Sequence, residues 1–254
     1  MIRELISERH FVEKSGFRWR GGDVSRIEGL SDAVFAFAIT LLVVALEVPS
    51  TFEELQKILY GFIGFAFSFA LFIYIWHCHY KFFRRYGMQS TSLTVMNSVL
   101  LFFVLFYIYP LKFLSSYLLN VFSGSKGIVT LADGSQVQMF QGSDASGLML
   151  IYSIGFAAIF LVFVLMHFHA YRKRKELNLS EVERLHTIAS ISEYSIMVLT
   201  GLLSILIVLI TNQSSWAGWV YAFFIGPAQG ISGFIMGSKI HKVRMDTKTD
   251  QVNT

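Results

Sequence analysis

The chain alternates between long apolar stretches and shorter charged segments. Five stretches contain no Lys, Arg, Asp or Glu, and most reach the roughly 20 residues that a helix needs to cross a bilayer. The last stretch is long enough for two crossings, with Thr211–Trp216 (TNQSSW) as the turn between them. The pattern therefore predicts six transmembrane helices. The five stretches are Ala33–Leu46, Ile58–Tyr80, one within Tyr86–Leu111, Ala145–Tyr171 and Tyr194–Ser238.

The first and third helices have recognisable ends. Ser25 and Glu28 have the Ser-x-x-Glu spacing of a capping box, in which each side chain bonds the backbone N–H of the other residue. We therefore expect the first helix to begin at Ser25 and to run without a break to Val48. Pro49 is expected to end it, and Pro110 to end the third helix, because proline lacks the N–H that a helix interior needs.

The remaining segments suggest smaller elements. The run GIVTLADGSQVQMF has two β-type halves around Asp133 and Gly134, which predicts a hairpin in a long loop. Met1–Val12 has the spacing of a short interfacial helix, although a frayed tail fits nearly as well. The expected organisation is an N-terminal segment (1–25), a six-helix membrane domain (26–241) and a tail (242–254).

Two features of the last helices are interpreted as structural. Gly226 and Gly230, like Gly233 and Gly237, are four residues apart, a spacing that favours close packing of membrane helices. Glu193 directly precedes the last uncharged stretch, so we expect it at the start of the fifth helix and at the membrane interface.

Composition supports the same class of protein. Apolar residues make up 54% of the 254 residues, 25 of them are Phe, and only 15% are charged. This is too apolar for the surface of a soluble globular protein. Cys78 is the single cysteine, which excludes a disulfide within the chain and a cysteine-based metal cluster. The first 25 residues are charged throughout and do not resemble a secretory signal peptide.

The basic residues predict the orientation in the membrane. All but three of the 21 lysines and arginines fall on one side of a six-helix topology, namely in the N-terminal segment, the second and fourth connections and the tail. Lys57, Lys112 and Lys126 fall on the other side. By the positive-inside rule both termini are expected in the cytoplasm.

Asp32 and Glu47 flank the uncharged part of the first predicted helix. The uncharged segment between Asp32 and Glu47 spans about 21 Å of helix, against a hydrocarbon core of about 30 Å. One or both carboxylates are therefore expected at membrane depth, where contact with lipid would be costly. The helix is expected inside the bundle, with Asp32 as a cap or a snorkelling side chain at the interface as the alternative.

The topology supplies partners for this carboxylate. The second helix ends and the third begins on the side where the first starts, so Trp76, His79 and Asn97 are expected at about the depth of Asp32. Their donor groups could satisfy the carboxylate and join three helices. A proton relay through the same residues is the alternative interpretation.

Catalytic and metal sites are not predicted. His77 and His79, like His167 and His169, are two residues apart, which places their rings on different sides of a helix. The chain contains none of the HExxH, GxSxG, Walker or GxGxxG motifs. We therefore expect no enzyme activity, no metal, no cofactor and no nucleic-acid partner.

The first three helices carry a family resemblance. RIEGLSDAVFAFAITLLVV resembles the signature of the transmembrane protein 175 family of lysosomal and bacterial potassium channels, whose first helix opens with Arg-x-x-x-Phe-Ser-Asp and continues to Ile-Thr-Leu-Leu. WHCHYKFF resembles the end of its second helix, and the third helix likewise opens with Asn and runs to a proline. The matching residues are Arg26, Ser31, Asp32, Ile39, Thr40, Leu41, Leu42, Trp76, His79, Phe83, Asn97 and Pro110.

The resemblance implies an architecture and a site. The bacterial members resemble homotetramers whose first helices line a central pore, which here implies a constriction at Phe37. Thr40 matches a threonine that contributes to potassium selectivity, and Leu41 and Val44 follow Phe37 on one helix face. The polar residues Arg26, Ser31, Asp32, Trp76, His79 and Asn97 match the motif network of the family.

Three positions depart from the family pattern. Phe37 replaces the usual Ile or Leu at the constriction, so four phenylalanines would narrow or dewet the pore differently. Leu30 replaces the Phe of the first motif, and Tyr80 replaces a second His. Packing between helices is the alternative role for Phe37.

These observations predict an all-α, six-span homotetramer in the inner membrane of a bacterium. Its function is expected to be that of a potassium-selective or weakly selective cation channel, with K⁺ as the permeant ion and other monovalent cations or protons as further candidates. A secondary or proton-coupled transporter is the alternative, with Asp32 and His79 as protonatable groups. A membrane scaffold without transport is a third class.

Overall fold

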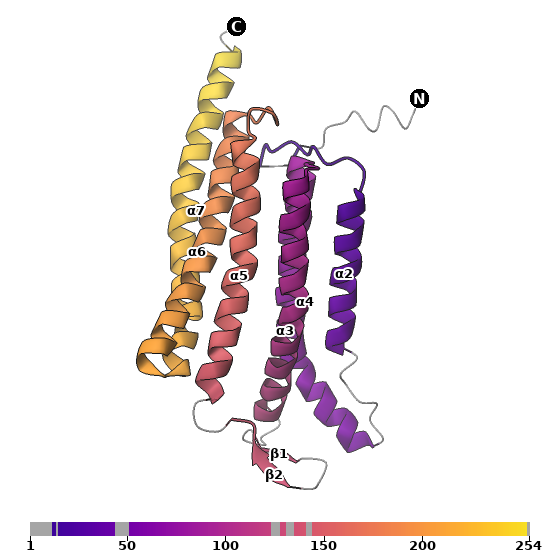
Figure 1. The fold of residues 1–254 in the computed structure, drawn as a ribbon. Coiled ribbons are helices and arrows are strands. Elements are labelled where there is room, and N and C mark those ends of the chain that lie inside the picture. Colours follow the sequence, from indigo (N-terminus) through magenta and orange to yellow (C-terminus); the bar gives the residue numbers. More distant parts are fainter. Residues whose placement is uncertain are drawn as a thin grey trace.

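The chain forms a bundle of long helices with a small hairpin at one end (Figure 1). The computed structural model describes residues 12–13, 15–43, 51–122, 128–130, 135–140 and 144–252. Within these residues six helices are present, as predicted. They are α2 (Arg26–Val43), α3 (Phe52–Tyr86), α4 (Thr91–Phe122), α5 (Asp144–Arg172), α6 (Glu181–Thr211) and α7 (Ser214–Val252).

Four of the described helices are long and apolar enough to cross a membrane, which supports a multi-pass membrane protein. They are α4 over Thr91–Leu114, α5 over Asp144–Arg172, α6 over Glu181–Thr211 and α7 over Ser214–Met245.

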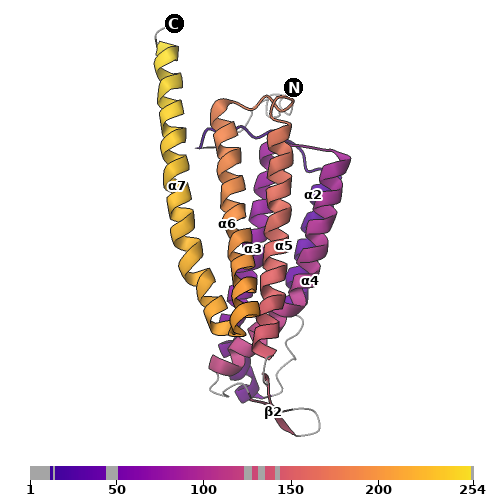
Figure 2. The same cartoon turned by 60° about the vertical axis from the view of Figure 1, so that its left-hand side comes forward.

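The helices pack as two groups of three. α2 contacts α3 and α4, whereas α6 packs between α5 and α7, and the contact of α4 with α5 joins the groups (Figures 1 and 2). The two-stranded hairpin lies at the end of the bundle opposite the C-terminal end of α7 (Figure 1). Buried aromatic side chains fill the interior between α3, α4 and α5, among them Phe72, Phe82 and Phe160.

The hairpin pairing and the turn between the last two helices are confirmed, whereas the predicted hairpin turn at Asp133 and Gly134 lies outside the described residues. β1 (Ile128–Thr130) pairs antiparallel with β2 (Gln136–Gln138), with Val129 opposite Val137. At the α6–α7 turn, Asn212 adopts a left-handed conformation (φ 52°) and its N–H donates to the Val208 carbonyl at 2.8 Å.

The capping box of the first helix is also confirmed. The Ser25 N–H donates to Glu28 Oε1, and the Glu28 N–H donates to Ser25 Oγ, both at 3.2 Å. The predicted continuation to Val48 and the end at Pro49 fall in residues 44–50, and the predicted helix over Met1–Val12 falls almost wholly in residues 1–11. Both segments lie outside the described residues.

Two predicted helix boundaries are wrong. α4 continues past Pro110 to Phe122, because proline removes only one helical hydrogen bond and neighbouring helices support such positions in membrane helices. The Tyr152 hydroxyl of α5 donates to the carbonyl of Pro110 itself, which ties this turn of α4 to α5. α6 begins at Glu181, so Glu193 lies several turns inside the helix, where the Tyr74 hydroxyl donates to its carboxylate at 3.2 Å. A search for uncharged stretches detects only the apolar part of such a helix.

The glycines of α7 do not pack closely within the chain. A Cβ added to Gly226, Gly230, Gly233 or Gly237 would meet no atom of the described residues within 4 Å. The spacing that favoured close packing is therefore not used against the neighbouring helices of the same chain.

Candidate functional site on helix α2

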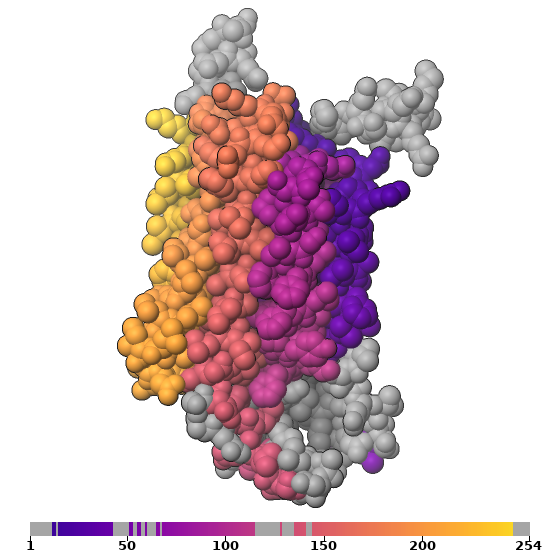
Figure 3. All heavy atoms as spheres, in the orientation of Figure 1, coloured from indigo at the N-terminus to yellow at the C-terminus, as the bar shows by residue number. Residues whose placement is uncertain are grey.

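Helix α2 has a buried face and an exposed face. The exposed face lies at the edge of the bundle, and among the described helices α2 packs mainly against α3 and α4 (Figure 3). The spacing of three to four residues on each face is that of a helix in which one side packs and the other is free. The buried face comprises Ser31, Phe35, Ala38 and Leu42, and the exposed face comprises Asp32, Ala33, Ala36, Phe37 and Thr40.

The predicted pore-lining residues divide between these faces. The Phe37 side chain is 59% exposed, and Thr40 is exposed one turn further along. Leu41 is half-buried and packs against the core, so it lies at the border of the exposed face. Val44 lies outside the described residues.

The Thr40 hydroxyl has a defined orientation. Its Oγ1 donates to the Ala36 carbonyl at 2.8 Å, within α2. Because the proton is committed to the backbone, the oxygen lone pairs are left for a donor or a cation on the exposed side. A hydroxyl in this state can accept or coordinate but has no proton to donate.

The buried face of α2 is joined to α3 and α4 by a chain of hydrogen bonds. Asn97 Nδ2 donates to Ser31 Oγ at 2.9 Å, and His79 Nε2 lies 2.8 Å from Asn97 Oδ1. The amide oxygen only accepts, so His79 Nε2 is the protonated ring nitrogen in this arrangement. Ser31 Oγ in turn donates to the Ile27 carbonyl at 2.8 Å. All three side chains are buried, and their polar groups satisfy one another.

A second contact lies beside this chain. Trp76 Nε1 donates to Asp32 Oδ1 at 2.9 Å, and the indole stacks on the Tyr80 ring with 5.6 Å between centroids. Arg26 is exposed and makes no hydrogen bond or ion pair with the described residues. The structure therefore brings together five of the six residues of the predicted network and leaves Arg26 apart.

An N-terminal segment that the sequence interpretation did not assign to the bundle crosses the ends of the helices. We call the described residues between 12 and 22 the strap (Figure 1). Phe17 is fully buried, edge-on to the Tyr86 ring at 5.6 Å and beneath the Arg85 guanidinium at 4.7 Å. The strap thereby covers the C-terminal end of α3.

Ion pairs hold the strap in place. Arg85 Nη2 of α3 lies 2.7 Å from Glu13 Oε2, and Arg20 Nη2 lies 2.7 Å from Glu183 Oε2 of α6. Burial by itself would raise the pKa of Glu13, but hydrogen bonds from Arg85, Ser15 and Trp19 and the charge of Arg85 lower it to about 2. The charged residues Glu13, Arg18 and Arg20 were the available signal in the sequence, but their charges alone do not identify their partners.

The chain is similar to known potassium channels. The profile of the family described as endosomal/lysosomal potassium channel TMEM175 matches residues 26–107, which include all the predicted site residues. A potassium channel of Marivirga tractuosa is 38% identical over 235 residues, covering 91% of this chain and 94% of the relative.

Solved structures show the same fold. A variant of the potassium channel MtTMEM175, in complex with a nanobody fusion protein, matches with a TM-score of 0.75 and 37% identity over 90% of this chain and all of that chain. A TMEM175 homologue from Chamaesiphon minutus matches with a TM-score of 0.52 and 22% identity, over 85% of this chain and 96% of that chain, and shares the fold. The resemblance inferred from the first three helices is thus confirmed, and the chain belongs to the TMEM175 family of potassium channels, which are ion channels and not enzymes.

Proposed function

We propose that the chain is one subunit of a homotetrameric potassium channel in a bacterial inner membrane, with the α2 helices lining the pore. The observation that carries the proposal is the free face of α2. It leaves Phe37 and Thr40 uncovered although the opposite face is packed and hydrogen-bonded. A helix at the edge of a membrane bundle with a hydroxyl and an aromatic ring on its free face is suited to line an axis shared by several copies.

In this proposal Phe37 forms the constriction. Four copies of its ring around the axis would make a hydrophobic gate that hinders ion passage by dewetting. Thr40 follows within one turn, and its oxygen lone pairs replace part of the hydration of a monovalent cation as it passes. The permeant ion is K⁺, with other monovalent cations and protons as competitors.

The buried side of α2 supplies the rigidity that such a pore needs. The hydrogen bonds that Asn97 donates to Ser31 and that His79 donates to Asn97 tie α2 to both neighbouring helices. A site is more precise when it lies on an element whose supporting residues are themselves fixed. We infer that this network holds the constriction in register and does not carry protons.

The proposed orientation places both termini in the cytoplasm. The strap, the α5–α6 connection and the C-terminal end of α7 lie at the end of the bundle opposite the hairpin, and this end carries most of the lysines and arginines. Lys112 belongs to the part of α4 nearer the hairpin, whereas Lys126 lies outside the described residues.

The test is ion flux in liposomes containing the purified protein. Phe37→Ala is expected to increase K⁺ flux, because it removes four rings from the constriction. Phe102→Ala is the matched control, since Phe102 is a similarly exposed phenylalanine (64%) on α4. Equal flux in Phe37→Ala and wild-type protein, with both proteins assembled to the same extent, would contradict the pore assignment.

A further inference from the structure

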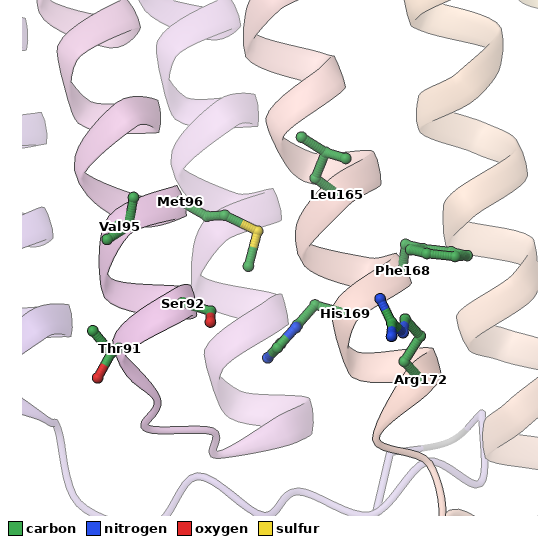
Figure 4. Close-up of a pocket in the computed structure, with 8 residues that line it drawn as sticks. All are labelled: Thr91, Ser92, Val95, Met96, Leu165, Phe168, His169 and Arg172. Carbon is green, nitrogen blue, oxygen red and sulfur yellow. The ribbon is translucent and has the colours of Figure 1, made fainter.

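A cavity lies between α4 and α5, away from the exposed face of α2. Its volume is about 490 Å³, and it opens between the N-terminal turns of α4 and the C-terminal turns of α5 (Figure 4). These two helix ends are also the ends of two membrane-crossing segments, Thr91–Leu114 and Asp144–Arg172. The cavity is therefore at the boundary between membrane and water. Its lining residues are Thr91, Ser92, Val95, Met96, Leu165, Phe168, His169 and Arg172.

The lining is divided into two layers. On α4, Val95 and Met96 follow Thr91 and Ser92 by four residues, which is one turn or about 6 Å deeper into the bundle. On α5 the order reverses, because the helix runs the other way. Leu165 and Phe168 precede His169 and Arg172 by the same four residues. Figure 4 shows the polar side chains nearer the loops and the apolar side chains further in.

The outer layer of the cavity, formed by Thr91, Ser92, His169 and Arg172, favours an anion. The lining includes two hydroxyls, an imidazole and a guanidinium, and none of the lining residues is acidic. Arg172 is exposed and makes no hydrogen bond or ion pair within the described part of the chain, whereas the neighbouring Lys173 is paired with Glu176 at 2.9 Å. A guanidinium matches the geometry of a phosphate through two parallel hydrogen bonds.

We propose that this cavity binds an anionic phospholipid of the inner leaflet. The phosphate lies against Arg172 and His169, with the hydroxyls of Thr91 and Ser92 as further partners. The acyl chain extends along the apolar layer that begins at Phe168. A wholly apolar ligand would make no hydrogen bonds to the outer layer. A free anion would make no contact with the apolar inner layer of Val95, Met96, Leu165 and Phe168. The binding is distinct from conduction and is measurable without ion flux.

The first test counts bound lipid on the detergent-purified full chain by native mass spectrometry. Phosphatidylglycerol is compared with phosphatidylcholine of the same acyl chains. Arg172→Gln is expected to weaken phosphatidylglycerol binding about fivefold, the effect of one basic side chain near an anionic surface. Lys175→Gln is the matched control, because Lys175 is exposed nearby but does not line the cavity. Equal losses in the two variants, or no loss in Arg172→Gln, would overturn the proposal.

A second test separates the lipid from other occupants. Inorganic phosphate is expected to displace phosphatidylglycerol poorly. Phe168→Ser is expected to weaken phosphatidylglycerol binding without changing phosphate binding. If phosphate displaced bound phosphatidylglycerol as effectively as added lipid does, the inner layer would not bind the acyl chain and the proposal would be overturned. Ser92→Cys in a Cys78→Ser background tests for a second copy, since Cys78 is the single cysteine. Efficient disulfide cross-linking between copies at Ser92→Cys would show that the cavity is a subunit interface and not a lipid site.

Discussion

Asn97 is the residue on which the contact between α2, α3 and α4 depends most directly. Its amide donates to Ser31 and accepts from His79, so one side chain serves two helices. Asn97→Ala leaves the buried His79 N–H without its acceptor, whereas Ser31 keeps its bond to the Ile27 carbonyl, and one unsatisfied buried group costs about 1–3 kcal/mol. We expect a loss of about 1–3 kcal/mol in stability, seen as a lower melting temperature of the detergent-purified protein.

Ser98→Ala provides the comparison for this prediction. Ser98 is the next residue on α4, but it is exposed and its hydroxyl donates only to the Thr94 carbonyl at 3.0 Å. We expect its melting temperature to stay close to that of the wild type. If Asn97→Ala were no less stable than Ser98→Ala, the network would not be what holds α2 in place.

The residues of the network could be predicted, but their pairing could not. Depth in the membrane placed Asp32, Trp76, His79 and Asn97 at one level, because helix rise converts residue number into distance. It did not predict that Asn97 binds Ser31 or that, among the described residues, Trp76 alone binds Asp32. Those pairings depend on the rotation of each helix about its axis, which the spacing of isolated polar residues does not determine.

The strap has a pH dependence that follows from Glu13. Its pKa is lowered from 4.5 to about 2 in the folded chain, so the carboxylate stabilises the strap fully above about pH 4.5. This contribution is lost as the pH falls from about 4.5 towards 2, where the folded protein must also take up the proton. We expect Glu13→Gln to have a lower melting temperature than the wild type above about pH 4.5. The difference in melting temperature is expected to shrink as the pH falls towards 2.

Glu181→Gln is the control for the strap. Glu181 is a 63% exposed carboxylate that pairs with Arg184 at 3.3 Å, a solvent-exposed contact that contributes little. Its removal is expected to change the melting temperature little at any pH. A constant difference between Glu13→Gln and wild type across the whole range would show that the ionised carboxylate does not stabilise the strap.

Gly87 lets the strap approach the end of α3. It has a φ of 57°, and a Cβ there would lie 2.7 Å from the carbonyl carbon and oxygen of Arg20. Gly87→Ala therefore combines a left-handed backbone with a steric clash, and we expect a loss of roughly 1–3 kcal/mol in thermal unfolding experiments. Gly22→Ala is the control, since no atom lies within 4 Å of its added Cβ. Equal melting temperatures for the two variants would refute the close approach.

Elements were easier to predict than their boundaries. Six helices and the hairpin follow from runs of apolar residues and from turn chemistry, which are local properties of the chain. The continuation of α4 past Pro110 and the early start of α6 at Glu181 depend on tertiary contacts and on charged residues that a helix tolerates. The strap was missed for a related reason, because its fold comes from ion pairs with α3 and α6 and not from its own periodicity.

At the scale of the whole molecule, the two faces of α2 connect the fold with permeation. Membrane class and family followed from composition and from three motifs, whereas the exposure of Phe37 and Thr40 required the packed structure. A helix that is apolar on nearly all sides gives no sequence signal for which side is covered. Packing of α3 and α4 against one side determines it.

Thr40 provides the test of selectivity at this scale. Its oxygen lone pairs are oriented away from the Ala36 carbonyl, so Thr40→Ala removes one polar ligand per subunit from the proposed pore. We expect the preference for K⁺ over Na⁺ to fall, measured as a shift of the bi-ionic reversal potential towards zero. Thr94→Ala is the matched control, because Thr94 is exposed on α4 and its hydroxyl also donates to a carbonyl four residues earlier, at 3.1 Å. Loss of selectivity in both variants, or in neither, would show that Thr40 has no specific role in discriminating between K⁺ and Na⁺. Phe37 would then remain as the candidate functional residue on the described part of the exposed face of α2.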